Sequence, residues 1–203
     1  MKSKTAVVCC CVLFVAAAVV LLPRVPQAFA QDARSANVNI DIWDYCDPTS
    51  FNNAVGPGTC NRSTVNGAIT FDGFVAEVSA EESVGAWRFA PNELAVNQGT
   101  VLQLHNLGGE THTFTQVKRF GGGFVDFLNG ASGNPTPAPE CAQVVNGQLV
   151  PQPPGPDNQF IDPGTTVSHP LGKDDVVVNY QCCVHPWMRV VITPRNTNPQ
   201  PIH

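Results

Sequence analysis

Charged residues are scarce in this sequence: only 13% of its 203 residues are Asp, Glu, Lys or Arg. The 11 basic residues are outnumbered by 16 acidic ones, and this balance excludes a nucleic-acid partner, because phosphate binding requires a basic surface. The length excludes a large multidomain enzyme, since one domain usually takes about 100–150 residues. Apolar residues make up 43% and aromatic residues 8%, which is enough for a packed core, so the chain is not globally disordered.

The first thirty residues are predicted to be a secretory signal peptide. Lys2 and Lys4 precede an apolar run over residues 6–22, and the Ala-Phe-Ala sequence at 28–30 is typical of a cleavage site. The alternative is an uncleaved membrane anchor, because the run approaches the roughly 17–25 residues that a bilayer requires. We expect cleavage after residue 30, which gives an exported protein, periplasmic or extracellular, without a membrane span.

Loss of this segment changes both the charge and the cysteine count. Removing its three basic residues leaves 8 basic against 16 acidic residues, a net charge of about −8. Three of the eight cysteines leave as well, and five remain: Cys46, Cys60, Cys141, Cys182 and Cys183. Disulfides persist in exported proteins, but five is an odd number, so at least one thiol has another role. The spacing of Cys46 and Cys60 predicts a local disulfide.

Short alternating and β-branched segments, separated by turn residues, predict an all-β sandwich. A helix is expected only over residues 72–83. The strands are expected at 38–43, 87–90, 93–96, 100–106, 111–117, 165–169, 175–182 and 188–193, with one more near 148–150. Residues 86–195 are predicted to form the sandwich, 31–85 an N-terminal extension, and 196–203 a flexible tail.

A long Pro- and Gly-rich loop, residues 134–163, interrupts the predicted sandwich. Connections of this length without secondary structure are uncommon in compact domains. The loop is therefore either functional or held in place by a crosslink. Cys141 lies near its middle and is the residue that would hold it.

The strongest local signal is the segment from Cys182 to Met188, Cys-Cys-Val-His-Pro-Trp-Met. It places a thiolate, the imidazole of His185 and a thioether within seven residues, where one predicted strand ends and the next begins. A trigonal set of two His and one Cys with a weak axial Met is the blue-copper arrangement. Such a set requires a second imidazole from elsewhere in the chain, and His112 is the candidate.

Together, the two motifs resemble those of the cupredoxins, the type 1 blue copper proteins. Tyr180 precedes Cys182 by two residues, as an aromatic residue does in that family. The Cys-x-x-His-x-x-Met spacing is similar to that of its amicyanin-like and plastocyanin-like members. Upstream, Asn106 and the His-Thr-Phe-Thr sequence at 112–115 are close to the other histidine motif of the family. The resemblance covers residues 86–195 and implies a Greek-key β-sandwich that binds one type 1 copper ion.

The resemblance implies His112, Cys182 and His185 as strong ligands and Met188 as the weak axial ligand. Cys183 departs from the family pattern, because its relatives usually carry a residue without sulfur there. Strand alternation places Cys182 and Cys183 on opposite faces, and Cys183 as ligand would leave only one residue before His185. Cys182 is therefore the predicted thiolate, and Cys183 is free to pair with Cys141.

The sequence also predicts roles or positions for several other polar side chains. Candidates to orient the copper ligands through hydrogen bonds are Asn106, Thr111 and Thr113. The carboxylates near the first strand lack the Gly and Glu of a calcium loop and are expected on the solvated surface: Asp41, Asp44 and Asp47. The remaining histidines are expected on the surface as well: His105, His169 and His203.

The function implied by the resemblance is electron transfer by an exported carrier, with His185 at an apolar patch through which electrons leave. Cupredoxin enzymes require additional copper sites with paired histidines, and this chain has only five His, so no enzymatic activity is expected. The alternative is a copper-binding module for delivery or sensing, which would need an exchangeable, exposed site. The redox partner and the oligomeric state are left open, although the acidic charge favours a basic partner.

Overall fold

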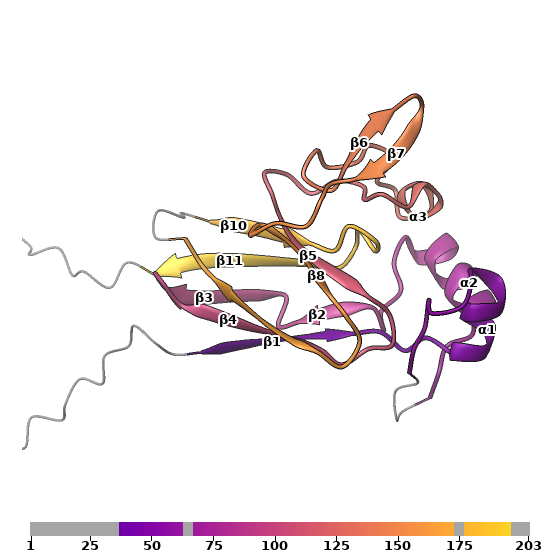
Figure 1. The fold of residues 1–203 in the computed structure, drawn as a ribbon, viewed down its shortest axis with the longest axis horizontal. Coiled ribbons are helices and arrows are strands. Elements are labelled where there is room, and N and C mark those ends of the chain that lie inside the picture. The colour runs from indigo at the N-terminus through magenta and orange to yellow at the C-terminus, as the bar shows by residue number, and fades with distance from the viewer. Residues whose placement is uncertain (1–36, 63–66, 173–176, 196–203) are drawn as a thin grey trace, which may run out of the picture. The chain divides into compact units, whose positions relative to one another are not determined.

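Two β-sheets pack face to face in the computed structural model, which describes residues 37–62, 67–172 and 177–195 (Figure 1). The all-β sandwich predicted from the sequence is therefore present. The predicted signal segment, 1–30, and the predicted tail, 196–203, lie outside the described residues.

The first sheet has the strand order β2-β1-β4-β9. The strands are β1 (Val38–Trp43), β2 (Arg88–Ala90), β4 (Val101–Asn106) and β9 (Thr166–Pro170). β1 runs parallel to β4, and the other pairs are antiparallel. Alternate side chains of β1 and β4 are buried, so that Ile40 and Leu104 face the core while Asp41 and His105 face outward.

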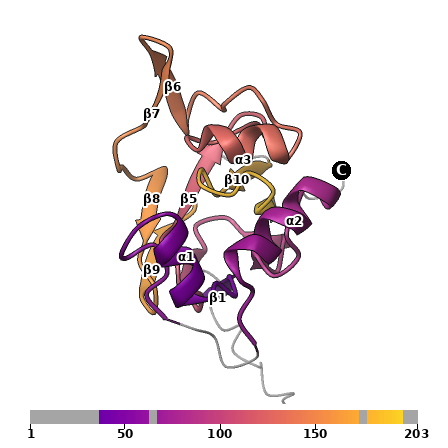
Figure 2. The same ribbon diagram turned by 90° about the vertical axis from the view of Figure 1, so that its right-hand side faces the viewer.

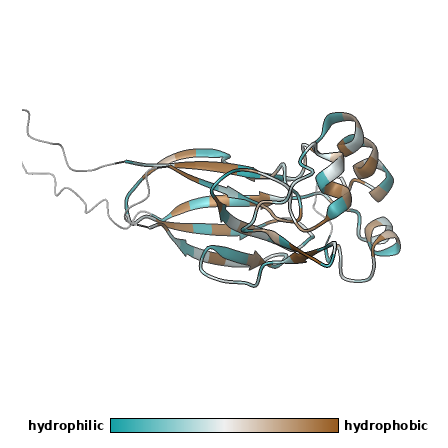
Figure 3. Ribbon diagram, turned by 90° about the horizontal axis from the view of Figure 1, so that it is seen from above, coloured by the Kyte–Doolittle hydropathy of each residue, from teal (hydrophilic) through white to brown (hydrophobic). Residues whose placement is uncertain are grey.

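The second sheet has the strand order β3-β11-β10-β5-β8. The strands are β3 (Glu93–Asn97), β5 (His112–Val117), β8 (Asn158–Ile161), β10 (Val178–Gln181) and β11 (Arg189–Arg195). Phe114 of β5 stacks on Tyr180 of β10 with ring centroids 4.2 Å apart, and it meets Phe89 of the first sheet edge to face. Figure 3 shows the alternation of apolar and polar residues along the strands.

The segment before residue 86 contributes directly to the sandwich. The predicted boundary at residue 85 would leave residues 31–85 outside it, but β1 is an inner strand, hydrogen-bonded to β2 on one side and β4 on the other. The reason lies in its alternation: Ile40 and Ile42 are fully buried in the hydrophobic core, which requires β1 to be part of the sandwich.

Three helices gather at one end of the sandwich (Figure 2). They are α1 (Pro48–Ala54), α2 (Phe71–Glu81) and α3 (Asp126–Ala131). The helix predicted over 72–83 is confirmed as α2, whereas α1 and α3 were not predicted. α1 begins because the Asp47 side chain accepts a hydrogen bond from the Ser50 amide and Pro48 fits the first helical turn.

The Pro-rich loop contains more structure than the sequence predicted. A hairpin of β6 (Ala142–Val145) and β7 (Gln148–Pro151) stands on it, and only the second of these strands was expected. Cys141 forms a disulfide with Cys183 at the base of the hairpin, so the predicted crosslink is present. Across the described part of the chain, none of the helices has the length and apolar character required to cross a bilayer.

Candidate metal centre

Three of the four predicted ligands come together at the end of the sandwich beneath the helices. His112 is the first residue of β5, and Cys182 and His185 lie in the loop between β10 and β11. The Cys182 Sγ lies 3.7 Å from the His112 Nδ1 and 3.9 Å from the His185 Nδ1, and all three ligand atoms lie within 4.8 Å of one another. The sequence order of these residues did not require this proximity; the pairing of β5 with β10 produces it.

The spacing of these three atoms fits a metal ion. With bond lengths of about 2.0 Å to nitrogen and about 2.3 Å to sulfur, as for zinc, a trigonal arrangement separates sulfur from nitrogen by about 3.7 Å. The observed separations of 3.7 and 3.9 Å agree with this value. The side chains are buried, with His112 and Cys182 fully inaccessible and His185 2% exposed. Thiolate and imidazole donors in this combination suit copper.

Met188 is held in the same loop by the backbone. Its amide donates to the His185 carbonyl at 2.9 Å, and its carbonyl accepts from the Cys182 amide at 3.0 Å. These two hydrogen bonds close the loop into a tight turn, and the Met188 side chain is buried. Its role as an axial ligand stays a prediction.

The cysteines pair as the sequence suggested. Disulfides join Cys46 to Cys60 and Cys141 to Cys183. Among the described residues, the single free cysteine is Cys182, which is fully buried. Of the five cysteines after residue 30, the one that forms no disulfide is thus Cys182, which faces the two imidazoles.

The surroundings of Cys182 favour the thiolate form of its side chain. Burial alone would raise the pKa of the thiol, but the hydrogen bonds and positive charges of His112 and His185 outweigh it and hold the pKa well below its usual value. The amide of Thr113 also donates to the Cys182 Sγ at 3.4 Å. Burial would lower the pKa of His112, yet its hydrogen bonds to Asp44 and Cys182 raise the pKa to about 10 in the metal-free protein.

The three predicted orienting residues have different roles. Thr113 contacts the site twice, because its amide faces the Cys182 sulfur and its hydroxyl accepts the Cys183 amide at 2.7 Å. Asn106 is buried and braces the loop before β5, donating to the carbonyls of Glu110 and Ile161. The hydroxyl of Thr111 bonds to the Asp162 carboxylate at 3.0 Å, away from the ligands.

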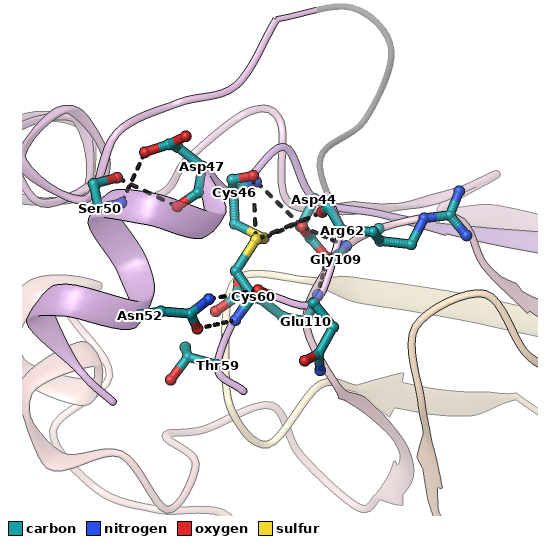
Figure 4. Close-up of a disulfide and its surroundings, with 12 residues drawn as sticks. Asp44, Cys46, Asp47, Ser50, Asn52, Thr59, Cys60, Arg62, Gly109 and Glu110 are labelled. Atoms are coloured by element: carbon teal, nitrogen blue, oxygen red, sulfur yellow. Dashed lines mark hydrogen bonds between the residues drawn. A yellow bond between two sulfur atoms is a disulfide. The ribbon is translucent and has the colours of Figure 1, made fainter. Parts of the chain in front are cut away.

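Sequence reasoning missed two carboxylates beside the site. Asp44, expected on the surface, is fully buried, and its Oδ2 lies 2.9 Å from the His112 Nε2. The Glu110 Oε2 lies 3.5 Å from the His185 Nε2. The expectation for Asp44 was wrong because the loop between β4 and β5 folds over the end of β1 and covers it (Figure 4).

The pKa values of the two carboxyls move in opposite directions. Burial raises the pKa of Asp44, but the hydrogen bond and charge of His112 and the backbone amides of the loop lower it by more, so the net shift is downward. For Glu110, burial is the larger effect and the pKa is raised, although the neighbouring His185 opposes the shift.

The sequence did contain a signal for the close approach of this loop. A Cβ at Gly108 would collide with the Asp44 carboxylate, and one at Gly109 would collide with the Arg62 carbonyl and the Cys46 sulfur. Two consecutive glycines in the loop before a candidate ligand strand indicate that another backbone or side chain comes close.

Two histidines are more buried than expected. His185 is covered by an aromatic cluster, with ring centroids 5.4 Å from Trp187, 6.1 Å from Phe74 and 6.3 Å from Trp87. The imidazole is therefore not at the surface, because α2 lies over it. The assignment of His169 to the surface was wrong, since its Nε2 lies 2.9 Å from the Tyr180 hydroxyl in the core.

Comparisons with known proteins find similar solved structures at low sequence identity. A purple cupredoxin from Nitrosopumilus maritimus is similar over 78% of this chain and 100% of its own, with 16% identity and a TM-score of 0.37. A reduced amicyanin variant is similar over 60% of this chain and 89% of its own, with 17% identity and a TM-score of 0.32. No protein-family model and no curated protein matches the sequence.

Proposed function

We propose that this protein is an exported, mononuclear type 1 copper protein that carries single electrons, with His112, Cys182, His185 and Met188 as ligands. One observation supports this more than any other: a lone buried thiol and two Nδ1 atoms converge within 4.8 Å, at separations that fit a metal ion. A His₂Cys set with a nearby Met is the donor combination of blue copper. When bound, copper would supply a one-electron couple.

The chain keeps the site rigid and dry. All three strong donors are buried, the ligand loop is closed by two backbone hydrogen bonds, and the Nε2 atoms of both imidazoles face fixed carboxylates. A donor set that cannot rearrange changes little between oxidation states. This favours rapid electron transfer and disfavours enzymatic turnover at the metal, which would need an open coordination position for a substrate.

The burial of the three strong donors favours electron transfer over the alternative of copper delivery or sensing. A delivery module has to release its ion to a partner, and this requires accessible ligands. Here His185, the most exposed of the three strong donors, is only 2% exposed. We therefore favour a retained ion over an exchanged one.

The visible spectrum of the oxidised, copper-loaded protein tests the proposal. We expect an intense thiolate-to-copper charge-transfer band that is lost in Cys182→Ser and His112→Ala. The matched control is His105→Ala, because His105 is a partly exposed histidine on strand β4 of the other sheet and should leave the band unchanged. A colourless copper complex would refute the electron-carrier assignment, and rapid transfer of copper to a chelator would favour delivery.

The partner is proposed to be a basic redox protein outside the cytoplasm. The net charge of about −8 after removal of residues 1–30 would attract a basic surface, and association would slow as salt screens the charges. Stopped-flow electron transfer at increasing ionic strength measures this. A rate that does not change with salt contradicts an electrostatic encounter.

The proposed export is tested separately: N-terminal sequencing of the secreted protein tests cleavage after residue 30.

A further inference from the structure

Each of the two imidazoles at the site presents its outer nitrogen to a buried carboxylate. The His112 Nε2 meets Asp44 at 2.9 Å, and the His185 Nε2 meets Glu110 at 3.5 Å. The exposed fractions of the two carboxylate side chains are 0% and 9%. Buried carboxylates are rare unless they are paired, so two of them behind one donor set require an explanation.

Asp44 is held as a carboxylate by four donors. Besides the His112 ring, its oxygens accept the backbone amides of Gly109 at 2.8 Å, Glu110 at 3.0 Å and Cys46 at 3.3 Å. A neutral acid would have to use one oxygen as a donor, and no acceptor faces it among these contacts. Figure 4 shows Asp44 beside Gly109 and the Cys46–Cys60 disulfide.

This arrangement also fixes the tautomer of His112. Because the Asp44 oxygen can only accept, the His112 Nε2 keeps its hydrogen, and the proton that a metal displaces is the one on the Nδ1 that faces Cys182. The orientation is fixed at the same time, since Asp44 is tied to the backbone of the very loop that leads into β5.

Glu110 occupies the equivalent place for His185. The indole Nε1 of Trp87 donates to the Glu110 Oε2 at 2.5 Å, and this holds the carboxyl toward the imidazole. Thus the two positioning carboxylates come from separate segments, one after β1 and one before β5, and each is held by its own hydrogen bonds.

We propose that Asp44 and Glu110 are positioning residues that orient the two imidazoles, and that the Asp44 carboxylate also biases the site toward Cu(II) by placing negative charge behind His112. The inference rests on the proposed function. Negative charge near a metal stabilises its higher oxidation state, and in a buried site it is weakly screened. Removing the Asp44 charge should therefore favour Cu(I) and raise the reduction potential.

Redox titration of copper-loaded Asp44→Asn and Glu110→Gln tests this. Both changes keep the shape of the side chain, and Asp44→Asn removes a carboxylate charge. We expect Asp44→Asn to increase the ratio of Cu(I) to Cu(II) affinity at least tenfold, which is about 59 mV for a one-electron couple, and Glu110→Gln to change this ratio less. The matched control is Asp41→Asn, because Asp41 forms the same kind of pair with His105, at 3.5 Å, on the partly exposed face of the sheet. Its potential should not change.

A second readout does not depend on copper redox chemistry. In ¹⁵N NMR of the zinc-loaded protein, the His112 Nε2 should carry a slowly exchanging proton whose signal is lost in Asp44→Asn and kept in Asp41→Asn. If Asp44→Asn does not fold, Glu110→Gln tests the positioning role, because the proton on the His185 Nε2 should then exchange faster than in the wild-type protein.

The outcomes separate the two proposals. A ratio of Cu(I) to Cu(II) affinity that rises less than tenfold in Asp44→Asn, in a protein that keeps the charge-transfer band, would overturn the bias toward Cu(II), and so would a lowered potential. Absence of that band in the wild-type protein would instead overturn the copper assignment itself.

Discussion

The Cys141–Cys183 disulfide is predicted to stabilise the fold without forming the copper site. Its two cysteines are 42 residues apart and buried, and the crosslink ties the base of the β6–β7 hairpin to the residue next to the proposed thiolate. The perturbation is the double variant Cys141→Ala with Cys183→Ala, which removes the crosslink and leaves no new free thiol beside Cys182.

The length of the closed loop gives the magnitude. Chain entropy predicts a loss of about 4 kcal/mol in the free energy of unfolding for a separation of 42 residues. The same relation gives about 3 kcal/mol for the 14-residue separation of Cys46 and Cys60, so the double variant at that pair is a matched control. Typical domains have about 5–15 kcal/mol of stability, so the first variant should still fold.

Urea unfolding of the metal-free protein measures the loss, and the visible spectrum of the copper form tests the site. We expect the charge-transfer band to persist, because Thr113 still accepts the amide of residue 183 and the Phe124 amide still donates to its carbonyl. A loss below about 1 kcal/mol would refute the entropic argument. A folded variant without the band would refute the separation of stability from site formation.

Three further changes test the environment of the site. Gly108→Ala should reduce copper affinity at least tenfold, because the added Cβ would collide with the Asp44 carboxylate. The control is Gly155→Ala, whose added Cβ has no atom within 4 Å and should leave the affinity unchanged. Equal copper affinities of the two variants would contradict the close approach of Gly108 to Asp44. Phe74→Ala should cost about 3–5 kcal/mol and speed thiol labelling of the metal-free protein; unchanged labelling would exclude Phe74 as a cover. The hydrogen bonds from Ser50 lower the pKa of Asp47, so the stability that the Asp47 carboxylate contributes is present above about pH 4 and lost as pH falls. In urea titrations at pH 7 and pH 3, the free energy of unfolding of Asp47→Asn should therefore decrease less between the two pH values than that of the wild-type protein. An equal decrease in both proteins would contradict this.

The strands and the ligand loop could be predicted because their signals are local. Leu102 and Leu104 alternate with polar residues, which identifies a half-buried strand from six residues alone. The spacing from Cys182 to Met188 is contained within one loop, and the odd number of cysteines singled out one thiol before any contact was known. Each of these inferences needs only neighbours in sequence.

The carboxylates behind the imidazoles could not be predicted in this way, because each depends on a distant contact. Asp44 is 68 residues from His112, and its neighbours Asp41 and Asp47 do lie nearer the solvent, so nothing local separates it from them. His169 was misassigned for the same reason: it lies in the short strand β9, but its buried partner, Tyr180, comes from the other sheet.

The segment before residue 86 is the reason that this site differs from what the resemblance implied. It supplies β1, whose end presents Asp44 to one imidazole, and α2, whose Phe74 covers the other. Under the proposed electron-carrier function, the cover over His185 favours exit through the aromatic side chains packed on it and not through an exposed imidazole edge. Among these, Trp187 is the nearest ring, at 5.4 Å, and it is only partly buried, so it connects the ligand loop with the surface. Exit through Trp187 would place the partner's docking face beside the β10–β11 loop, at the edge of the helices and not on top of them.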